Sequence, residues 1–391
     1  MKLIYISHLR FPSEKTHSTF AMKTCESFAT RGIDVELWVP RRWNPKFGKD
    51  DPFLYHNIKR NFVMRRLPVI DIWSFMGGNV GFFILTGTFN LSVFFYAVFR
   101  GSIRKSIFYI HTPADAIFCV MTGAYIFIEI HELNRIYQNG NYFIRWFLSR
   151  MLGLIATNRF KAEFLKKRFG ISTRHILCQQ DAVDVKMFSI ETSRKEARRI
   201  LNVLEAQRVF LYTGHLFAWK GADTLFDAHR LLDRKEMIYF VGGTDKDIRR
   251  FRTKSEKLKV KNVVFVGHRP HEEMPLWLRA ADILILPYSA QFDITKYEAS
   301  PLKLFEYMAS GRPTVVADLP SVREIVNEEL VWFFEPDSPD SLMEALNRVF
   351  SSPEQAEKKA RRAREEANLY TWEKRADNII SFIRKQVNPI L

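Results

Sequence analysis

Short β-rich runs alternate with amphipathic helical stretches along most of this 391-residue chain. Near its start, the pattern predicts a strand at 2–7, a helix at 19–31 that ends at Gly32, and a second strand at 34–40. A strand, a crossover helix and a second strand form a β-α-β unit, in which the two strands run parallel. Because the alternation continues, the sequence predicts an α/β protein with parallel sheets and helices on both faces.

The alternation forms two series, which indicates two doubly wound domains. The further strand-like runs are 106–110, 125–130, 154–156 and 175–178, then 208–213, 237–241, 262–266, 283–287 and 314–317. We predict an N-terminal domain at 1–186, a polar linker at 187–206, a second domain at 207–370 and a C-terminal helix at 371–391. Ligands of such sheets bind outside the carboxyl ends of the strands. We therefore expect the functional site in a cleft between the two domains.

The net charge of +16 is concentrated in the first domain. Residues 1–186 carry 26 Lys and Arg against 13 Asp and Glu, a net +13, which leaves +3 for the remainder. Such a basic domain suits nucleic acid, an anionic membrane or a phosphorylated substrate. The sequence has no helix-turn-helix, zinc-finger or aromatic RNA-binding signature, so we do not expect nucleic acid. Three widely spaced cysteines and a short apolar start exclude a disulfide framework and indicate a cytoplasmic protein.

No charged residue occurs between positions 72 and 99, a run rich in phenylalanine. Its length alone suits a transmembrane helix, whereas its glycines, threonines and asparagines dilute it. Three interpretations stay open: a buried helix, a helix in the membrane interface, and a true span. The basic flanks that an interfacial helix needs on anionic lipid are present at Lys59, Arg60, Arg65, Arg66, Arg100, Arg104 and Lys105. The alternative for these flanks is a solvated basic rim.

The most informative motif is EASPLKLFEYMASGRP at 298–313. Ser300 is a good N-cap, Pro301 suits the first helical position, and Gly311 suits the helix end. The motif therefore predicts a helix of about ten residues between these signals.

This helix carries groups that suit a nucleotide sugar. The N–H groups of Leu302 and Lys303, with the helix dipole, suit a pyrophosphate. Glu298, ahead of the helix, can reach a sugar beyond the pyrophosphate, and Glu306 can reach a ribose beside it. The alternative is that the same residues only cap a core helix.

A second motif, YTGHLFAWKG at 212–221, follows a predicted strand. Gly214 lets a ligand approach the backbone, Lys220 can neutralise a leaving diphosphate, and His215 can assist it. Taken alone, this loop is also typical of a surface turn. We interpret it together with the 298–313 motif, because both loops belong to one sheet.

Weaker signals lie at other strand ends. Asp245 and Asp247 have the spacing of a divalent-metal site, but carboxylates at a helix start are also explained by the dipole. His131 ends an apolar strand and is either structural or part of the site. Further donor-binding candidates are Gly267, Ser300 and Pro301, and the acceptor-side candidates are Arg10, Lys15, His17 and Ser18.

Together these stretches resemble a retaining glycosyltransferase of family 4, which has the two-domain GT-B fold. The first half agrees in FPSEKTHSTFAMKTCESFATRG, EIHEL and DAVDVKMF. The resemblance implies that Glu298 contacts the donor sugar, Glu306 the ribose and Lys220 the diphosphate, and that His131 lies close to the sugar. It also implies a last helix that returns to the first domain, and a front-face displacement in which the departing phosphate accepts the acceptor's proton, with no metal.

We therefore predict an enzyme that moves a sugar from a UDP- or GDP-linked donor to a lipid-linked or envelope polysaccharide acceptor. It would act at the cytoplasmic face of the membrane, bound peripherally, without a cofactor. The alternatives are a nucleotide-sugar 2-epimerase of GT-B fold and a non-catalytic binding or scaffold subunit. Glu298 speaks against a scaffold, which needs no carboxylate beyond a phosphate site.

Overall fold

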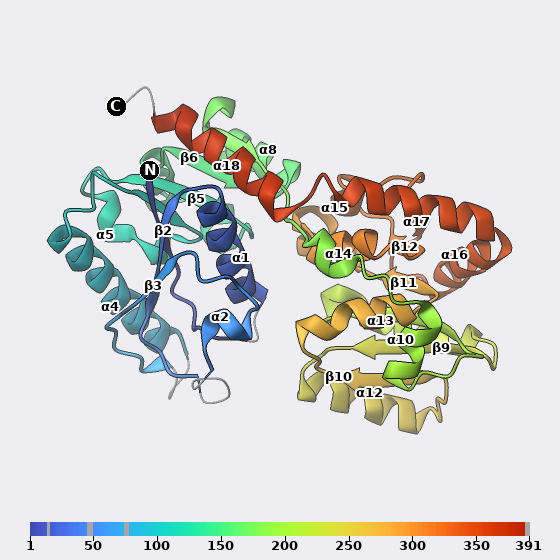
Figure 1. Cartoon of the computed structure of the whole chain (residues 1–391). Helices are drawn as coiled ribbons and strands as arrows, with labels where there is room; N and C mark the ends of the chain where they lie inside the picture. The colour runs from blue at the N-terminus through green and yellow to red at the C-terminus, as the bar shows by residue number, and fades with distance from the viewer. Residues whose placement is uncertain (14–15, 45–49, 74–77, 388–391) are drawn as a thin grey trace. The chain divides into compact units, whose positions relative to one another are not determined.

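The computed structural model describes residues 1–13, 16–44, 50–73 and 78–387, and the chain forms two compact units (Figure 1). Unit 1 comprises Met1–Gln180 together with Trp372–Leu391, and unit 2 comprises Asp181–Thr371. Each unit has its own core around a parallel sheet. The predicted α/β class is confirmed.

Among the described residues of unit 1, seven strands pair in the order β3-β2-β1-β4-β5-β6-β7. They are β1 (Lys2–Ile6), β2 (Asp34–Pro40), β3 (Val63–Leu67), β4 (Ile107–Ile110), β5 (Tyr125–Ile130), β6 (Gly153–Ala156) and β7 (Ile176–Cys178). All pairs are parallel, so each central strand is buried on both faces and reads as a continuous apolar run. The strand order reverses between β1 and β4, which makes this pair the switch point of the sheet.

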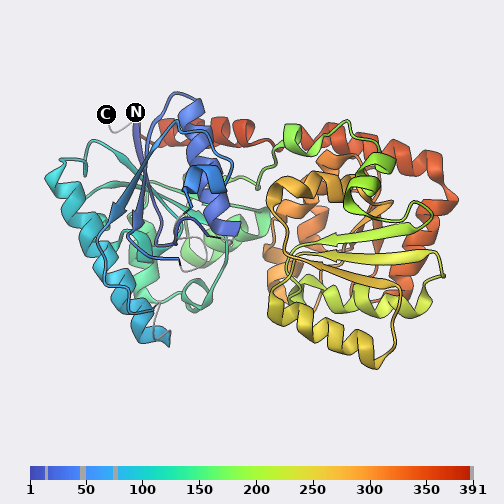
Figure 2. The same cartoon turned by 60° about the horizontal axis from the view of Figure 1, so that its bottom comes forward.

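Helices cover both faces of this sheet (Figure 2). They are α1 (Thr16–Thr30), α2 (Pro52–Tyr55), α4 (Gly78–Phe99), α5 (Ile117–Val120), α6 (Arg135–Asn139), α7 (Tyr142–Ser149), α8 (Arg159–Phe169) and α18 (Trp372–Val387). One face packs against α4 through residues such as Phe89 and Val93. The other packs against α1 and α18, where Ile379 and Ile383 join the core and Phe382 meets Phe127 of β5 with ring centroids 6.0 Å apart. The C-terminal helix is therefore a structural part of unit 1.

Helix α4 has two different faces. Phe89, Val93 and Ala97 are fully buried against the sheet, and Leu85 is also fully buried. The opposite face exposes large apolar side chains at Val80, Phe83, Leu91, Phe95, Val98 and Phe99. Among the described helices, α4 alone is long and apolar enough to cross a membrane by length and composition, with a mean hydropathy of 1.8. One third of that apolar stretch is buried within the protein.

In unit 2, the described residues form six strands in the order β10-β9-β8-β11-β12-β13, with the switch point between β8 and β11. They are β8 (Arg208–Thr213), β9 (Glu236–Val241), β10 (Val263–Gly267), β11 (Ile283–Leu286), β12 (Thr314–Ala317) and β13 (Trp332–Phe334). The longer helices are α10 (Arg194–Leu201), α12 (Asp245–Lys257), α13 (Met274–Ala280), α14 (Leu302–Ser310), α16 (Pro339–Ser351) and α17 (Pro353–Ala367). Shorter ones are α9 (Val185–Phe188), α11 (Ala222–Asp227) and α15 (Pro320–Arg323).

The stretch predicted as a linker, 187–206, forms part of unit 2 instead. Its helix α10 packs against α13, and Arg198 makes a buried ion pair of 2.6 Å with Asp282. The stretch is polar because, in α10, only Ala197 and Arg198 are buried, whereas half of the helical positions are exposed. The sequence also misses β3 and β13, since β3 is an edge strand with two arginines and β13 has only three residues.

Candidate active site

The loops after β8 and β11 approach each other closely at the switch point of unit 2. Gly214 directly follows β8 with a φ of +123°, and a Cβ there would lie 2.0 Å from Cε of Lys303. Gly221 has a φ of +69°, and a Cβ there would lie 1.6 Å from the carbonyl oxygen of Pro287. Both positive φ values favour glycine, and at Gly221 the backbone contact leaves no room for a side chain, so the loops after β8 and β11 are held against one another.

Lys220 is held among aromatic rings. Its Nζ donates a hydrogen bond of 2.8 Å to the hydroxyl of Tyr288 and lies 3.8 Å from the ring centroid of Trp219. Tyr288 follows β11 and is fully buried, and burial raises the pKa of its hydroxyl well above its usual value. Tyr288 and Trp219 therefore help to direct the ammonium group. Sequence analysis did not single out Tyr288 or Trp219.

Two further basic groups lie beside this lysine. Burial lowers the pKa of Lys303, and the Glu306 carboxylate only partly opposes this effect. Burial, followed by the charges of Lys303 and Lys220, also lowers the pKa of His215, whose ring stacks on Phe217 with centroids 4.9 Å apart. The charged forms of these groups disfavour one another, and a bound anion would relieve this repulsion.

The start of α14 differs from the prediction in one respect. Pro301 occupies the N-cap position with extended backbone, and Ser300 lies before it, so the predicted assignment of Ser300 as N-cap and Pro301 as first helical residue is wrong. The Ser300 hydroxyl instead accepts a hydrogen bond of 3.0 Å from the backbone N–H of Asp181. Asp181 is the first residue of unit 2, so this hydrogen bond fixes the start of the unit. The hydroxyl accepts from Asp181 and not from an N–H group of the first turn of α14. Leu302 and Lys303 begin α14 one residue later than predicted.

The two predicted carboxylates flank this helix start. Glu298 is buried and ends a π-helical turn at Ile294–Glu298, a rare conformation that occurs often at functional sites. The Glu306 side chain is 18% exposed, and its Oε1 lies 3.1 Å from Nε2 of His271. His271 is a neighbour that sequence analysis missed, because it lies 35 residues earlier, after β10.

The remaining candidates of unit 2 have structural partners. Gly267 ends β10 with a φ of +88°, and its carbonyl accepts a 2.8 Å hydrogen bond from Gly242. Asp247 forms a capping box with Thr244 at the start of α12, with Oδ2 2.7 Å from the threonine hydroxyl. Asp245 lies in the first turn of the same helix. These contacts match the helix-start interpretation of the two aspartates.

In unit 1, His131 lies in a cluster at the carboxyl ends of β4 and β5. Its ring stacks on His111 with centroids 4.7 Å apart, and its Nε2 lies 3.3 Å from Oε1 of Glu129. Burial, together with the charges of His111 and His17, lowers the pKa of His131 well below its usual value. His131 is therefore a neutral ring at neutral pH.

The side chains of His111, Glu129 and His131 have the composition and proximity of a metal site. Glu129, however, is ion-paired with Arg375 of α18 and accepts a 2.5 Å hydrogen bond from Tyr109. His111 bonds to the hydroxyl of Tyr5. Because a guanidinium already neutralises the only carboxylate of the three, the arrangement fits a polar network better than a divalent cation.

The acceptor-side candidates are only partly brought together. His17 is exposed on α1, and its ring meets that of His131 edge-on at 5.9 Å. The Ser18 hydroxyl is buried and donates to the carbonyl of Ser13 at 2.8 Å. Arg10 is half-buried in the loop after β1, and Lys15 lies outside the described residues.

Comparisons with known proteins agree with this architecture. Residues 193–366, all within unit 2, match the model of the family described as glycosyl transferases group 1. TuaH of Bacillus subtilis, a putative teichuronic acid biosynthesis glycosyltransferase, is 32% identical over 96 residues, 24% of this chain and 23% of that protein. Mannosylfructose-phosphate synthase of Agrobacterium fabrum is 26% identical over 254 residues, 61% of this chain and 54% of that one. The chain thus matches less than two thirds of these relatives' lengths.

HepE of Anabaena, solved in complex with UDP, superposes with a TM-score of 0.74. The two proteins are 14% identical, and the match covers 98% of this chain and 100% of that one. At this identity the likeness establishes the fold, which is the two-domain α/β fold GT-B. The family model in unit 2 adds support for a glycosyltransferase.

Proposed function

We propose that the chain is a glycosyltransferase whose unit 2 binds a nucleotide sugar linked to UDP or GDP. The observation that carries this proposal is the basic edge at the switch point, where Lys303 crosses Gly214 and interacts with His215 beside Lys220. Cleavage of a sugar–phosphate bond develops negative charge on the diphosphate, and cationic groups directed at that charge lower the barrier. The UDP bound in HepE supports this class of donor.

The finer proposal, which rests on the family 4 resemblance, is that the sugar keeps its anomeric configuration. The acceptor oxygen forms the new bond to the anomeric carbon as the bond to the diphosphate breaks. The bonding pair leaves with the diphosphate, which takes the proton of the acceptor hydroxyl. In this scheme Glu298 contacts the donor sugar and His131 lies close to it, so neither a carboxylate nucleophile nor a metal is required.

Two substitutions test the donor site. Glu306→Ala should weaken donor affinity about tenfold, the effect of losing a hydrogen bond to a charged group, whereas Lys220→Ala should mainly slow transfer. Titration calorimetry with UDP-glucose and GDP-mannose measures the first effect, and donor turnover the second. Glu344→Ala, an exposed glutamate of α16, is the matched control. Equal affinity in wild type and Glu306→Ala would refute the ribose assignment.

A chelation experiment tests metal independence. Activity should survive in EDTA, and a loss of activity that magnesium restores would refute metal independence.

We also propose that the acceptor is lipid-linked or an envelope polysaccharide, reached from the cytoplasmic face of the membrane. The exposed apolar face of α4 and the +13 charge of residues 1–186 support this proposal, because partial insertion and attraction to anionic lipid act together. The packing of Phe89 and Val93 in the core favours a helix lying in the interface over a true span. The teichuronic acid relative supports polysaccharide synthesis as the setting.

A further inference from the structure

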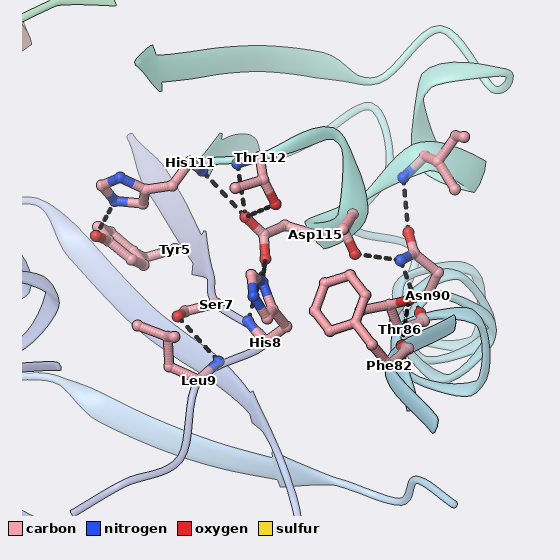
Figure 3. A network of polar contacts seen from close by, with 12 residues as sticks. Tyr5, Ser7, His8, Leu9, Phe82, Thr86, Asn90, His111, Thr112 and Asp115 are labelled. Atoms are coloured by element: carbon pink, nitrogen blue, oxygen red, sulfur yellow. Dashed lines mark hydrogen bonds and ion pairs between the residues drawn. The ribbon is translucent and has the colours of Figure 1, made fainter. Parts of the chain in front are cut away.

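A histidine and a buried aspartate meet at the switch point of unit 1. His8 follows β1, and Asp115 follows β4 in the short helix at Pro113–Asp115. The His8 Nδ1 lies 2.7 Å from Oδ1 of Asp115 (Figure 3). Ligands of doubly wound sheets bind outside the carboxyl ends of the strands where the strand order reverses. The pair therefore occupies the ligand-binding edge of this sheet.

Asp115 is fixed by hydrogen bonds on both of its oxygens. Oδ1 also accepts from the backbone N–H of His8 at 3.1 Å, and Oδ2 accepts from the backbone N–H groups of His111 and Thr112 at 3.2 and 2.9 Å (Figure 3). Burial alone would raise the pKa of Asp115, but His8 and these hydrogen bonds keep it below its ordinary value. The group is therefore a carboxylate that can only accept hydrogen bonds.

This arrangement sets the tautomer of His8. Because Asp115 can only accept, Nδ1 of the neutral ring must carry the hydrogen, and Nε2 keeps its lone pair. The His8 side chain is 17% exposed, so a ligand can reach it. Asp115 thus prepares a hydrogen-bond acceptor at the edge of the sheet.

The surroundings of His8 suit a saccharide. The ring of Phe82 in α4 meets the His8 ring edge-on, with centroids 5.9 Å apart. The ring centroid of Trp73 lies 5.7 Å from that of Phe82. A sugar ring has apolar C–H faces and polar hydroxyls, so an aromatic surface beside one directed polar group matches both. The same Phe82 belongs to the helix that we propose to contact the membrane.

We propose that Nε2 of His8 accepts a hydrogen bond from a hydroxyl of the acceptor saccharide, and that Asp115 is the positioning residue that makes this bond available. This inference rests on the proposed function. His8 holds a hydroxyl next to the nucleophilic one, whose own proton leaves with the diphosphate. His8 therefore takes up no proton from the acceptor during transfer, keeps the hydrogen on its Nδ1, and determines how the acceptor is oriented.

The tautomer gives a direct test that needs no substrate. Nitrogen NMR of the full chain with ¹⁵N-labelled histidine, with the His8 signals identified by their loss in His8→Gln, should show a protonated Nδ1 and an unprotonated Nε2. In Asp115→Asn the amide N–H can donate to Nδ1 of His8. In the folded variant the hydrogen should therefore move to Nε2 and leave Nδ1 unprotonated. A proton on Nε2 of neutral His8 in the wild type would overturn the proposal.

Kinetics test the role in acceptor binding. The probes are UDP-glucose and GDP-mannose as donors, with water and a panel of methyl glycosides as acceptors. His8→Ala should raise the acceptor KM about tenfold, the effect of one lost hydrogen bond, while donor hydrolysis by water stays unchanged. His8→Gln, whose amide oxygen can accept the same bond, should recover part of the loss.

His175 provides a matched control for the substitution of His8. His175→Ala removes a histidine of the same unit that lies before β7, at the opposite edge of the sheet, and should leave the acceptor KM unchanged. An unchanged acceptor KM in His8→Ala, with hydrolysis intact, would overturn this inference alone. A wild-type protein that neither binds nor hydrolyses any donor would instead overturn the proposed function.

Discussion

At the scale of single residues, Gly214 combines a positive φ of +123° with the close approach of the Lys303 side chain, so a larger residue must push that side chain aside. We expect Gly214→Ala to lower donor affinity at least about tenfold, because the new methyl group must displace the Lys303 ammonium as well as strain the backbone. Titration calorimetry and a melting curve measure both effects. Gly32→Ala is the control, since Gly32 also has a positive φ of +77° but no atom within 4 Å of the added Cβ. Equal affinity losses in both variants would contradict this explanation.

The lowered pKa of Lys303 makes donor binding depend on pH. A diphosphate favours the charged form, so binding raises this pKa and the protein takes up a proton when the pH lies between the free and bound values. Donor affinity should therefore fall as the pH rises through the free value. Calorimetry in alkaline buffers of different ionisation enthalpy should detect this proton uptake, and Lys303→Arg, which stays charged, should abolish it. Proton release in the wild type would contradict the sign.

Sequence spacing predicted which residues line the basic edge of unit 2, because a strand, a glycine turn and a helix start follow one another in the chain. It could not predict their partners. Tyr288 reaches Lys220 from the loop after β11, 68 residues later, and His271 reaches Glu306 from the loop after β10. The role of Ser300 was also hidden, since Asp181, its partner, lies 119 residues away.

At the scale of elements, alternation predicted most central strands within one or two residues, because buried parallel strands read as unbroken apolar runs. The edge strand β3 lacks this signal, because it contains Arg65 and Arg66. For α4 the composition left three interpretations open. Both faces of α4 are apolar, one buried and one exposed, so the sequence shows no polar side and apolar side. Only the packing in the structure distinguishes the two faces.

Helix α4 supports a prediction about membranes. Arg104 and Lys105 are exposed just after it, so Arg104→Glu/Lys105→Glu should reduce binding to phosphatidylglycerol vesicles about tenfold or more, at about 1 kcal/mol for each basic charge near the surface. Co-sedimentation measures this, with release expected as salt rises. Arg65 is a poorer choice, because its Nε lies 3.7 Å from the buried Glu36 and a glutamate there would repel it.

The control for that experiment lies elsewhere on unit 1. Lys166→Glu/Lys167→Glu makes the same charge change on α8, which packs on β6 and β7 at the other end of the sheet. Equal losses in both variants would mean that total charge, not α4, governs binding. A wild-type protein that ignores anionic vesicles at low salt would remove the main support for a lipid-linked acceptor.

At the scale of the whole molecule, unit 1 is built from two separate parts of the chain, whereas unit 2 is continuous. Ending the chain at Thr371 removes α18, including the buried Ile379, Ile380 and Ile383. At about 2 kcal/mol for each buried aliphatic side chain, this loss rivals the net stability of a domain, about 5–15 kcal/mol. Scanning calorimetry should show unit 1 unfolded and the transition of unit 2 retained, still raised by donor.

The outer surface of α18 provides the control for that truncation. Arg384→Ala/Lys385→Ala changes two exposed positions of the same helix and should leave both transitions in place. A truncated chain in which unit 1 still melts cooperatively would mean that the sheet and α1 suffice without α18.

The late position of α18 in the chain also affects how the protein is made. The ribosome completes the sheet of unit 1 first, but the helix that covers Phe127 and Ile155 emerges only after all of unit 2. Domains that emerge early usually fold early, and exposed apolar surface invites aggregation. Here the first unit to be synthesised is the last to be finished. The nascent chain therefore carries an uncovered apolar strip throughout the synthesis of unit 2, and this interval is when it most needs a chaperone.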